Sequence, residues 1–288
     1  MVDTAVQLAR PHALGGHDDE YVRPGPDATA HIWLELRAEV AAAAEAEPML
    51  SRFFDDMVLS HERFEDALAH ALVTRIADTN LPTARLREVI AAVYTSDPDI
   101  VHAGLLDVLA VRERDPASDS FAETLLYFKG FHALQAYRVA HWLWVNGRIQ
   151  LALYLQSRTS QVLAVDIHPA ARIGTGILID HATSVVIGET AVVDDNVSIL
   201  HEVTLGGTGK EHGDRHPKVG RGVLIGAGAK LLGNVKIGIG ARIGAGSVVL
   251  DDVCPHCTFA GVPAVNVGPN DVDEPALEMD HSLPHNAR

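Results

Sequence analysis

Basic residues are scarce in this sequence of 288 residues. Lysine and arginine number 23 against 38 aspartates and glutamates, the formal net charge is −15, and no basic block occurs. This balance argues against nucleic acid or an anionic membrane as a partner. Long apolar runs are also missing: the stretch from His141 to Gln156 is interrupted by Asn146 and Arg148, short of the roughly twenty residues of a membrane span. The first residues lack a signal-peptide pattern, so the cytoplasm is the expected location.

Cysteine is nearly absent as well. The two cysteines, Cys254 and Cys257, are spaced C-P-H-C, a spacing found in thiol redox sites where the first cysteine opens a helix. No helix is predicted after them, because the following residues include Gly261 and Pro263, which favour turns and extended chain. The pair is therefore expected to serve as small apolar fillers, with a redox role as the alternative.

A glycine-rich stretch, GGTGKEHGDRHP at 206–217, raises the question of a phosphate-binding loop. A P-loop requires a glycine, four residues, and then Gly-Lys followed by serine or threonine, whose hydroxyl reaches the magnesium ion. Here Glu211 follows Gly209-Lys210, and Thr204 stands where the first glycine is needed. The stretch does not meet the requirements of a nucleotide site.

The second half of the chain carries an internal repeat of six residues. Six is a whole number of two-residue pleats, so a side chain at every sixth position points the same way from its strand and enters a common interior. Glycine follows five of the repeated positions and suits the corners where the chain turns. The pattern predicts a left-handed parallel β-helix with three flat sides per coil. The repeated positions are 167, 173, 179, 185, 191, 197 and 203, then 219, 225, 231, 237, 243 and 249, and twelve of these thirteen are Ile, Leu or Val.

The register breaks once, between Val203 and Val219, which are sixteen positions apart instead of six. The ten additional residues predict a polar loop that leaves the prism and carries Arg215 and His216. The fold class is thus α+β: a helical domain, then a β-helix with one ejected loop. The predicted boundaries are a flexible segment at 1–27, a helical domain at 28–164, the β-helix at 165–267 and a flexible tail at 268–288. The helices are expected from the Ala-rich run at 28–47 and from helical spacing within 48–77, 83–94, 98–111 and 124–163.

Several longer motifs accompany this architecture, and together they resemble the serine O-acetyltransferases of cysteine biosynthesis. The resemblance covers residues 28 to 268, and the helical motifs separate it from other β-helix acyltransferases. Two features depart from the family: the C-P-H-C pair and the end of the chain at Arg288, where members that dock onto O-acetylserine sulfhydrylase carry isoleucine, so that complex is not expected. The motifs are EPML (47–50), RERDPA (112–117), LLYFKGFHALQAYRVAHWLW (125–144), VDIHPAARIG (165–174), IDHATSVVIGETAVV (179–193), VTLGGTGK (203–210), GDRHPK (213–218), GAGAKLLGN (226–234) and GVPA (261–264).

The resemblance implies acetyl transfer from acetyl-CoA to the hydroxyl of L-serine, with no metal, and inhibition by L-cysteine. It also implies a trimer, alone or paired into a hexamer, in which the loop and His181 meet across two subunits. His181 is the candidate general base, because imidazole titrates near neutral pH and can take the serine proton. By strand alternation it is expected to point inward with Ile179 unless the corner redirects it. Asp166, fifteen residues earlier, is expected to orient the imidazole.

Substrate binding requires groups for both charges of serine and a groove for acetyl-CoA. The resemblance assigns Asp115, Asp180, Arg215 and His216 to serine; the two carboxylates suit its ammonium group and the guanidinium suits its carboxylate. Small residues stacked on one face would leave room for the pantetheine arm. The candidates for acetyl-CoA are Gly207, Thr208, Ala227, Lys230 and Ala245, with Lys230 or Arg242 near phosphate.

Three alternatives remain open from the sequence. His181, His212 and His216 have side chains suited to zinc, and γ-class carbonic anhydrases hold zinc on this type of prism. A non-catalytic scaffold is the second, since a fold does not prove a function. The third is an acetyltransferase for another small acceptor such as homoserine, because one methylene is a weak discriminator, worth about 1–3 kcal/mol.

Overall fold

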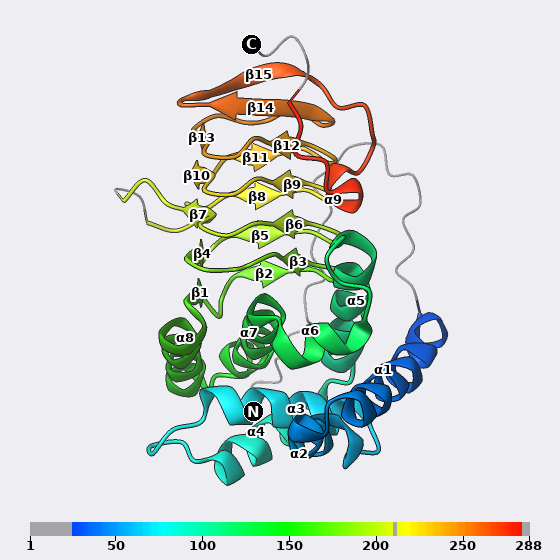
Figure 1. Cartoon of the computed structure of the whole chain (residues 1–288). Coiled ribbons are helices and arrows are strands. Elements are labelled where there is room, and N and C mark those ends of the chain that lie inside the picture. The colour runs from blue at the N-terminus through cyan, green and yellow to red at the C-terminus, as the bar shows by residue number, and fades with distance from the viewer. Residues whose placement is uncertain (1–24, 210–211, 284–288) are drawn as a thin grey trace.

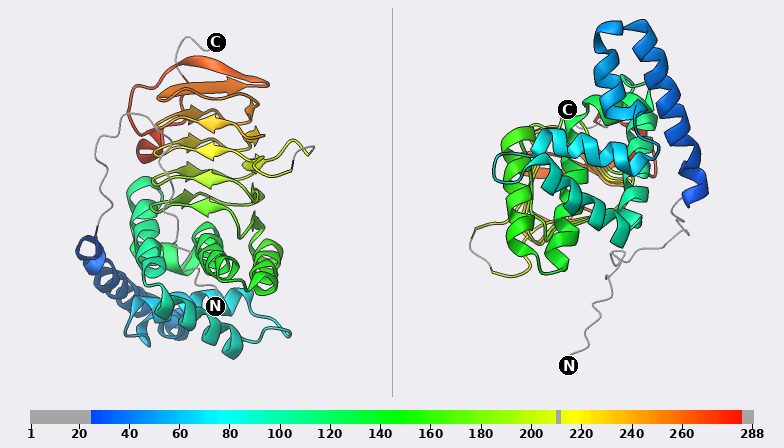
Figure 2. Two further views of the ribbon diagram at one scale, coloured as in Figure 1. Left: turned by 180° about the vertical axis from the view of Figure 1, so that it is seen from behind. Right: turned by 90° about the horizontal axis from the view of Figure 1, so that it is seen from below.

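The computed structural model describes residues 25–209 and 212–283. A helical base carries a three-sided prism of short strands, and the chain passes from one to the other after α8 (Figures 1 and 2). The segment predicted to be flexible at 1–27 lies almost entirely outside the described residues.

The helices of the first half agree with those predicted from the spacing of apolar residues. Its core is a single cluster that includes Ile32, Leu36, Leu68 and Leu72, none of which exposes any surface. Pro26 opens the first helix at a position where its missing N–H costs no hydrogen bond. No described helix is both long and apolar enough to cross a bilayer. The elements are α1 (Pro26–Ala46), η1 (Pro48–Leu50), α2 (Ser51–Phe54), η2 (Asp55–Leu59), α3 (Phe64–Ile76), α4 (Thr83–Ser96), α5 (Asp99–Arg114), α6 (Phe121–Tyr127), α7 (Lys129–Val145) and α8 (Ile149–Leu163).

The prism has three walls, each a sheet whose successive strands come from successive coils. Wall A is β1 (Val165–Ile167), β4 (Val185–Ile187), β7 (Thr204–Gly206), β10 (Lys230–Leu232) and β13 (Val248–Val249). Wall B is β2 (Arg172–Ile173), β5 (Val192–Val193), β8 (Lys218–Val219) and β11 (Lys236–Ile237). Wall C is β3 (Leu178–Ile179), β6 (Ser198–Ile199), β9 (Leu224–Ile225), β12 (Arg242–Ile243), β14 (Cys257–Gly261) and the antiparallel β15 (Ala264–Pro269). The predicted left-handed β-helix is confirmed.

The register of the first coil differs from the prediction. Ile167 pairs with Ile187, twenty residues on, whereas Ile187 pairs with Leu205, eighteen residues on. The two additional residues lie in the corner that contains His181. The six-residue pattern continued through this corner because Val185 and Ile187, two residues apart on one strand, both face the interior. A shift of two positions therefore leaves the hydrophobic period unchanged.

The predicted ejected loop leaves the prism between β7 and β8 (Figure 1). Val193 pairs with Val219, so this coil spans twenty-six residues, eight more than the regular eighteen. The sequence pattern counted ten, because it assigned the two additional residues of the first coil to the loop. The strands on either side keep their pairing, which shows that the insertion is accommodated at a corner rather than within a wall.

A buried ion pair joins the helical base to the first coil. Arg138 of α7 donates to Oδ2 of Asp107 of α5 from Nε at 3.0 Å and from a terminal nitrogen at 2.7 Å. The same carboxylate accepts the backbone N–H of Ile177 at 3.0 Å, and Arg138 also donates to the carbonyl of Gly174 at 2.8 Å. Both charged side chains are almost completely buried. The pair thus connects two helices and the β-helix in one network.

The end of the described chain differs from the flexible tail expected from residue 268. It forms α9 (Pro275–Glu278), and Glu274 pairs with Arg221 at 3.0 Å. The carbonyl of Ala276 accepts the Ser198 hydroxyl at 2.9 Å. The segment 274–283 therefore lies over wall C, where the carbonyl of Ser282 also accepts from Arg242.

The two cysteines form a bond rather than filling space. Cys254 and Cys257 are joined in a disulfide at the last corner of the prism, with their Cα atoms 5.6 Å apart. Cys254 is exposed and Cys257 is half-buried, so the prediction of buried apolar fillers is wrong. Spacing alone did not reveal how closely this turn brings the two side chains together.

One buried histidine makes the stability of the helical base depend on pH. Burial lowers the pKa of His132 from 6.5 to about 3, and Nε2 of its ring lies 2.7 Å from the carbonyl of Leu125. Between these values the unfolded chain binds the proton and the folded chain does not, so stability is lost as the pH falls below about 6.5. We expect this residue to contribute a loss of about 2 kcal/mol between pH 6.5 and pH 5. Urea unfolding of His132→Gln should show a correspondingly weaker pH dependence, and an unchanged dependence would contradict the assignment.

Candidate active site

The corner between β3 and β4 holds His181 in an unusual backbone conformation. His181, Ala182 and Ser184 have positive φ angles of 54°, 61° and 62°. The N–H of Ala182 donates to the carbonyl of Asp180 at 2.5 Å, and that of Thr183 donates to the carbonyl of His181 at 2.7 Å. Two successive three-residue turns at positive φ are strained for residues other than glycine, and such strain often marks functional positions.

The helical base holds this corner in place. Helix α7 approaches so closely that a Cβ on Gly130 would lie 2.0 Å from the carbonyl oxygen of Ile179. Lys129 also donates a hydrogen bond to the hydroxyl of Thr183. Only glycine permits this contact, and the helical domain therefore fixes the shape of the β-helix corner.

The side chain of His181 points to solvent and is 74 % exposed. The inward orientation predicted by strand alternation is wrong. Ala182 occupies the interior instead and is completely buried. The positive φ angles at this corner interrupt the alternation of the strand, and a redirection by the corner was the exception that the prediction included.

Two carboxylates accompany this imidazole. Asp180 Oδ2 lies 3.8 Å from His181 Nε2, and Asp115 follows the last residue of α5. Burial raises the pKa of Asp180, and the like charge of Asp115 raises it further, while the two nearby histidines, His181 and His201, oppose the shift. A cationic ammonium group placed here would relieve the repulsion between the carboxylates.

His201 is a member of this site that the sequence reasoning missed. Its ring centroid lies 5.7 Å from that of His181, with the rings edge to face. The six-residue pattern concealed it, because that pattern places Val197 next to Ile179. In the structure Ile199 pairs with Ile179, and the residues two positions later, His201 and His181, therefore occupy equivalent corners of successive coils. We call the corners between walls C and A the histidine edge.

Above His201 the histidine edge continues with two small residues, Ala227 and Ala245, which we call the alanine column. Ile225 and Ile243 extend the same pairing, which places Ala227 and Ala245 above His201. Both alanines were predicted to contact acetyl-CoA. The two basic residues predicted near the phosphate of acetyl-CoA already have partners within the chain. Lys230 donates a hydrogen bond to the carbonyl of Glu202. Arg242 is buried beneath the segment 274–283 and lies 3.9 Å from Asp280, so in this structure it is covered.

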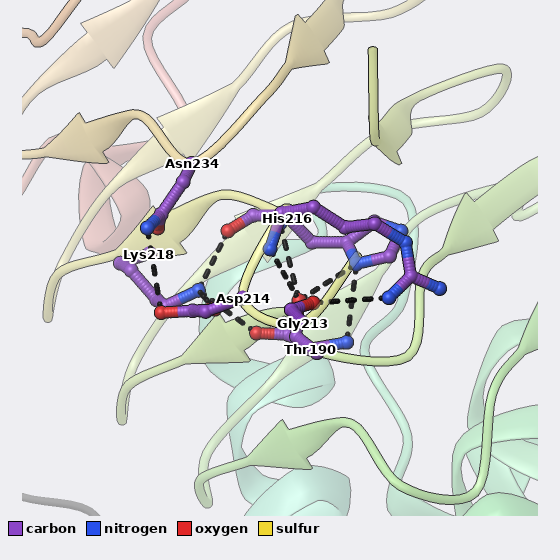
Figure 3. Close-up of polar contacts among 7 residues, drawn as sticks. Thr190, Gly213, Asp214, His216, Lys218 and Asn234 are labelled. Atoms are coloured by element: carbon purple, nitrogen blue, oxygen red, sulfur yellow. Dashed lines mark hydrogen bonds and ion pairs between the residues drawn. The ribbon is translucent and has the colours of Figure 1, made fainter. Parts of the chain in front are cut away.

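The base of the loop forms a second polar cluster, at the corners between walls A and B. The N–H of Thr190 donates to Nδ1 of His216 at 3.1 Å, so this nitrogen accepts and the other carries the ring proton (Figure 3). Burial, together with the cations Arg215 and Lys218, lowers the pKa of His216 and keeps it neutral. Lys218 donates to Asp214 Oδ1 at 2.5 Å and fixes the returning strand (Figure 3). We call these corners the loop edge.

Arg215 lies on the loop edge, where it is ion-paired. Its guanidinium donates to Glu189 Oε2 at 2.7 Å and lowers the pKa of that carboxyl. The predicted acetyl-CoA residues Gly207 and Thr208 lie on the same edge, and a Cβ on Gly207 would lie 3.5 Å from the Arg215 side chain. A bound carboxylate would compete with Glu189 for this guanidinium.

Within one chain the predicted site residues lie in two separate places. Asp115, Asp180 and His181 lie on the histidine edge, whereas Arg215 and His216 lie across wall A on the loop edge. Asp166 accepts a hydrogen bond from Gln156 at 2.7 Å and is placed on wall A rather than beside His181. Within the part of the chain that the structure describes, no group of three potential ligands is arranged to hold a metal, and His181 and His216 are apart.

A hexapeptide β-helix with an exposed corner imidazole and a column of small residues above it has the architecture of the hexapeptide acyltransferases. The sequence matches the family profiles "Serine acetyltransferase, N-terminal" over residues 32–136 and "Bacterial transferase hexapeptide (six repeats)" over residues 216–251. The serine acetyltransferase of Salmonella typhimurium is 54 % identical over 249 residues, covering 86 % of this chain and 91 % of that protein. The chain belongs to the serine acetyltransferase family and is an acyltransferase.

Solved structures of relatives have the same fold over most of this chain. A serine acetyltransferase in complex with cysteine is 50 % identical with a TM-score of 0.87, covering 89 % of this chain and 100 % of that one. The Brucella abortus serine acetyltransferase in complex with coenzyme A is 48 % identical with a TM-score of 0.83, covering 86 % of this chain and 99 % of that one.

Proposed function

We propose that this chain transfers the acetyl group of acetyl-CoA to the hydroxyl of L-serine, giving O-acetyl-L-serine and CoA. The observation that carries the proposal is the exposed His181 imidazole, beside two carboxylates, at the foot of the alanine column. The coenzyme A and cysteine complexes of relatives support it, because they bind the carrier and an amino acid of the size of serine.

In the proposed reaction His181 is the general base. It takes the hydroxyl proton as the serine oxygen attacks the thioester carbon, which becomes tetrahedral. The carbon–sulfur bond then breaks, and the proton passes from the imidazolium to the leaving thiolate. Positioned base catalysis of this kind is worth about 10²–10⁴-fold in rate.

In the proposed complex each charge of serine has its own binding groups. Asp115 and Asp180 would hold the ammonium group on the histidine edge, because their mutual repulsion favours a cation there. Arg215 would hold the carboxylate, with His216 beside it as a neutral hydrogen-bond donor. The acetyl-CoA arm would run past Ala227 and Ala245, with Gly207, Thr208 and Lys230 contributed from the adjoining wall and loop.

These groups form one site only if two copies of the chain meet. The histidine edge of one copy would face the loop edge of another, an arrangement that a homotrimer repeats three times and a pair of trimers six times. In this arrangement Asp166 of one copy would approach His181 of its neighbour and fix the tautomer of the imidazole. L-Cysteine would compete with serine, because it presents the same two charges to the same clamp.

A thiol-release assay tests the proposed reaction. With acetyl-CoA present, L-serine should release CoA much faster than homoserine or an amino sugar, and L-cysteine should slow the reaction in competition with serine. Release with another acceptor but not with serine would identify a different substrate. No release with any acceptor would favour a non-catalytic role.

Replacing Arg215 with alanine should weaken serine binding selectively. We expect the KM for serine to rise at least about tenfold, because a charge-assisted hydrogen bond is worth about 1.5–3 kcal/mol, while the KM for acetyl-CoA changes little. Steady-state kinetics with each substrate varied in turn measures the two values. The matched control is Arg172→Ala, an exposed arginine of the same β-helix. An equal rise in both KM values would contradict the carboxylate clamp.

A further inference from the structure

His201 lies between the candidate base and the proposed acetyl-CoA groove. The backbone of its coil bonds to the coils on both sides: the N–H of Asp180 donates to the carbonyl of Ile199 at 2.8 Å, and the N–H of Gly228 donates to the carbonyl of His201 at 2.9 Å. The order along the histidine edge is therefore His181, His201, Ala227 and Ala245. A thioester delivered along the alanines would meet His201 before it reaches His181.

The surroundings of the His201 ring distinguish its two nitrogens. Its Nδ1 atom is buried and has no hydrogen-bond partner among the described residues. A proton on Nδ1 would place a buried N–H at this position without an acceptor, which is costly. Orphaned buried N–H groups are rarer in proteins than unsatisfied acceptors, so the favoured tautomer carries its proton on Nε2.

We propose that His201 donates a hydrogen bond from Nε2 to the carbonyl oxygen of the acetyl thioester. This inference rests on the proposed function and adds a second catalytic residue to it. As the serine oxygen bonds to the carbonyl carbon, the electron pair of the C=O bond moves onto the oxygen that His201 contacts. When the carbon–sulfur bond breaks, that pair returns to re-form the carbonyl. The serine proton travels by way of His181 to the thiolate, and His201 keeps its own proton throughout.

The two imidazoles are arranged for these different tasks. His181 is 74 % exposed, so its ring can accept and release a proton, whereas His201 is half-buried. The alcohol oxygen and the carbonyl oxygen lie on one carbon in the tetrahedral intermediate. A base and a donor whose rings are 5.7 Å apart can reach one oxygen each.

The test compares two substitutions of His201. His201→Leu replaces the donor by an apolar side chain of similar size, and His201→Gln keeps an N–H group at a similar distance. We expect His201→Leu to lower kcat about 10²–10³-fold, the range found for loss of one oxyanion donor, with little change in the KM for acetyl-CoA. His201→Gln should recover at least about tenfold of that loss, because it restores a donor.

Two further readouts separate this role from a structural one. The acid limb of the kcat/KM pH profile should stay in place in His201→Gln, because in the proposed role the serine proton passes through His181 and not through His201. The infrared band of the ¹³C-labelled carbonyl of acetyl-CoA, bound without serine, should move to higher frequency in His201→Leu. The matched control is His31→Leu, an exposed histidine of α1, which should leave kcat and the band unchanged.

Each measured outcome either supports or contradicts the donor role of His201. Loss of kcat in His201→Leu, recovery in His201→Gln and a displaced band support the donor role. Activity of His201→Leu within about threefold of the parent chain, or an acid limb that moves in His201→Gln, would overturn it. If His201→Leu does not fold, as judged by circular dichroism, His201→Phe removes the donor in its place and is judged by the same kinetics and infrared band. If the parent chain itself releases no thiol with serine, the proposed function fails, while the carbonyl band still reports on His201.

Discussion

Replacing His181 with alanine is expected to lower kcat by about 10²–10⁴-fold, the usual contribution of a positioned general base. The serine hydroxyl would then have to lose its proton to water as it attacks the thioester. Binding of acetyl-CoA should be retained, because the alanine column that would hold its arm does not include this side chain. Steady-state kinetics with serine gives the first value, and calorimetric titration with acetyl-CoA gives the second.

The strained corner requires a matched variant for this experiment. His181 has a φ of 54°, a conformation that asparagine tolerates better than alanine does. His181→Asn therefore removes the base while preserving the corner, and the two substitutions should lower kcat to a similar extent. Near-normal turnover in His181→Asn would remove this histidine as the base, whatever the alanine variant does.

Replacing Asp107 with alanine should destabilise the fold by about 3–5 kcal/mol, because it leaves the buried guanidinium of Arg138 without its partner. The loss is expected to be large because Asp107 also holds the N–H of Ile177, so the substitution separates the helical base from the first coil of the prism. Chemical denaturation of parent and variant measures the difference. The corner of His181 rests on α7, the helix that carries Arg138, and activity should therefore fall at temperatures where the parent chain remains folded.

A double substitution distinguishes an unpaired charge from lost packing. Asp107→Leu combined with Arg138→Met replaces both charges by apolar side chains, which is often neutral or stabilising when such a pair is buried. We expect the double variant to be more stable than Asp107→Ala. The two variants would be equally unstable if the packing of this region, and not the charge, determined its stability.

The repeating pattern was sufficient to predict the prism and the loop. A side chain at every sixth residue can fill the common interior of a coil with three short sides, and the break before Val219 predicted a loop that leaves the prism. The motifs around His181, Arg215 and the helices were also sufficient to predict the family. The same periodicity concealed the two additional residues at the His181 corner, because positions two apart face the same way and a shift of two leaves no trace in the hydrophobic pattern.

Tertiary structure decided the orientation and the neighbours of the site residues. Alternation predicted that His181 points inward, but positive φ angles at the corner, held by the close approach of Gly130, turn it to solvent. His201 joined the site only when the coils were stacked, since residues twenty positions apart in sequence become neighbours through the pairing of Ile179 with Ile199. By itself the sequence determined the fold and the chemical groups, because both depend on local spacing and residue type. Their arrangement into two separated edges depends on contacts between distant segments, which only the folded chain specifies.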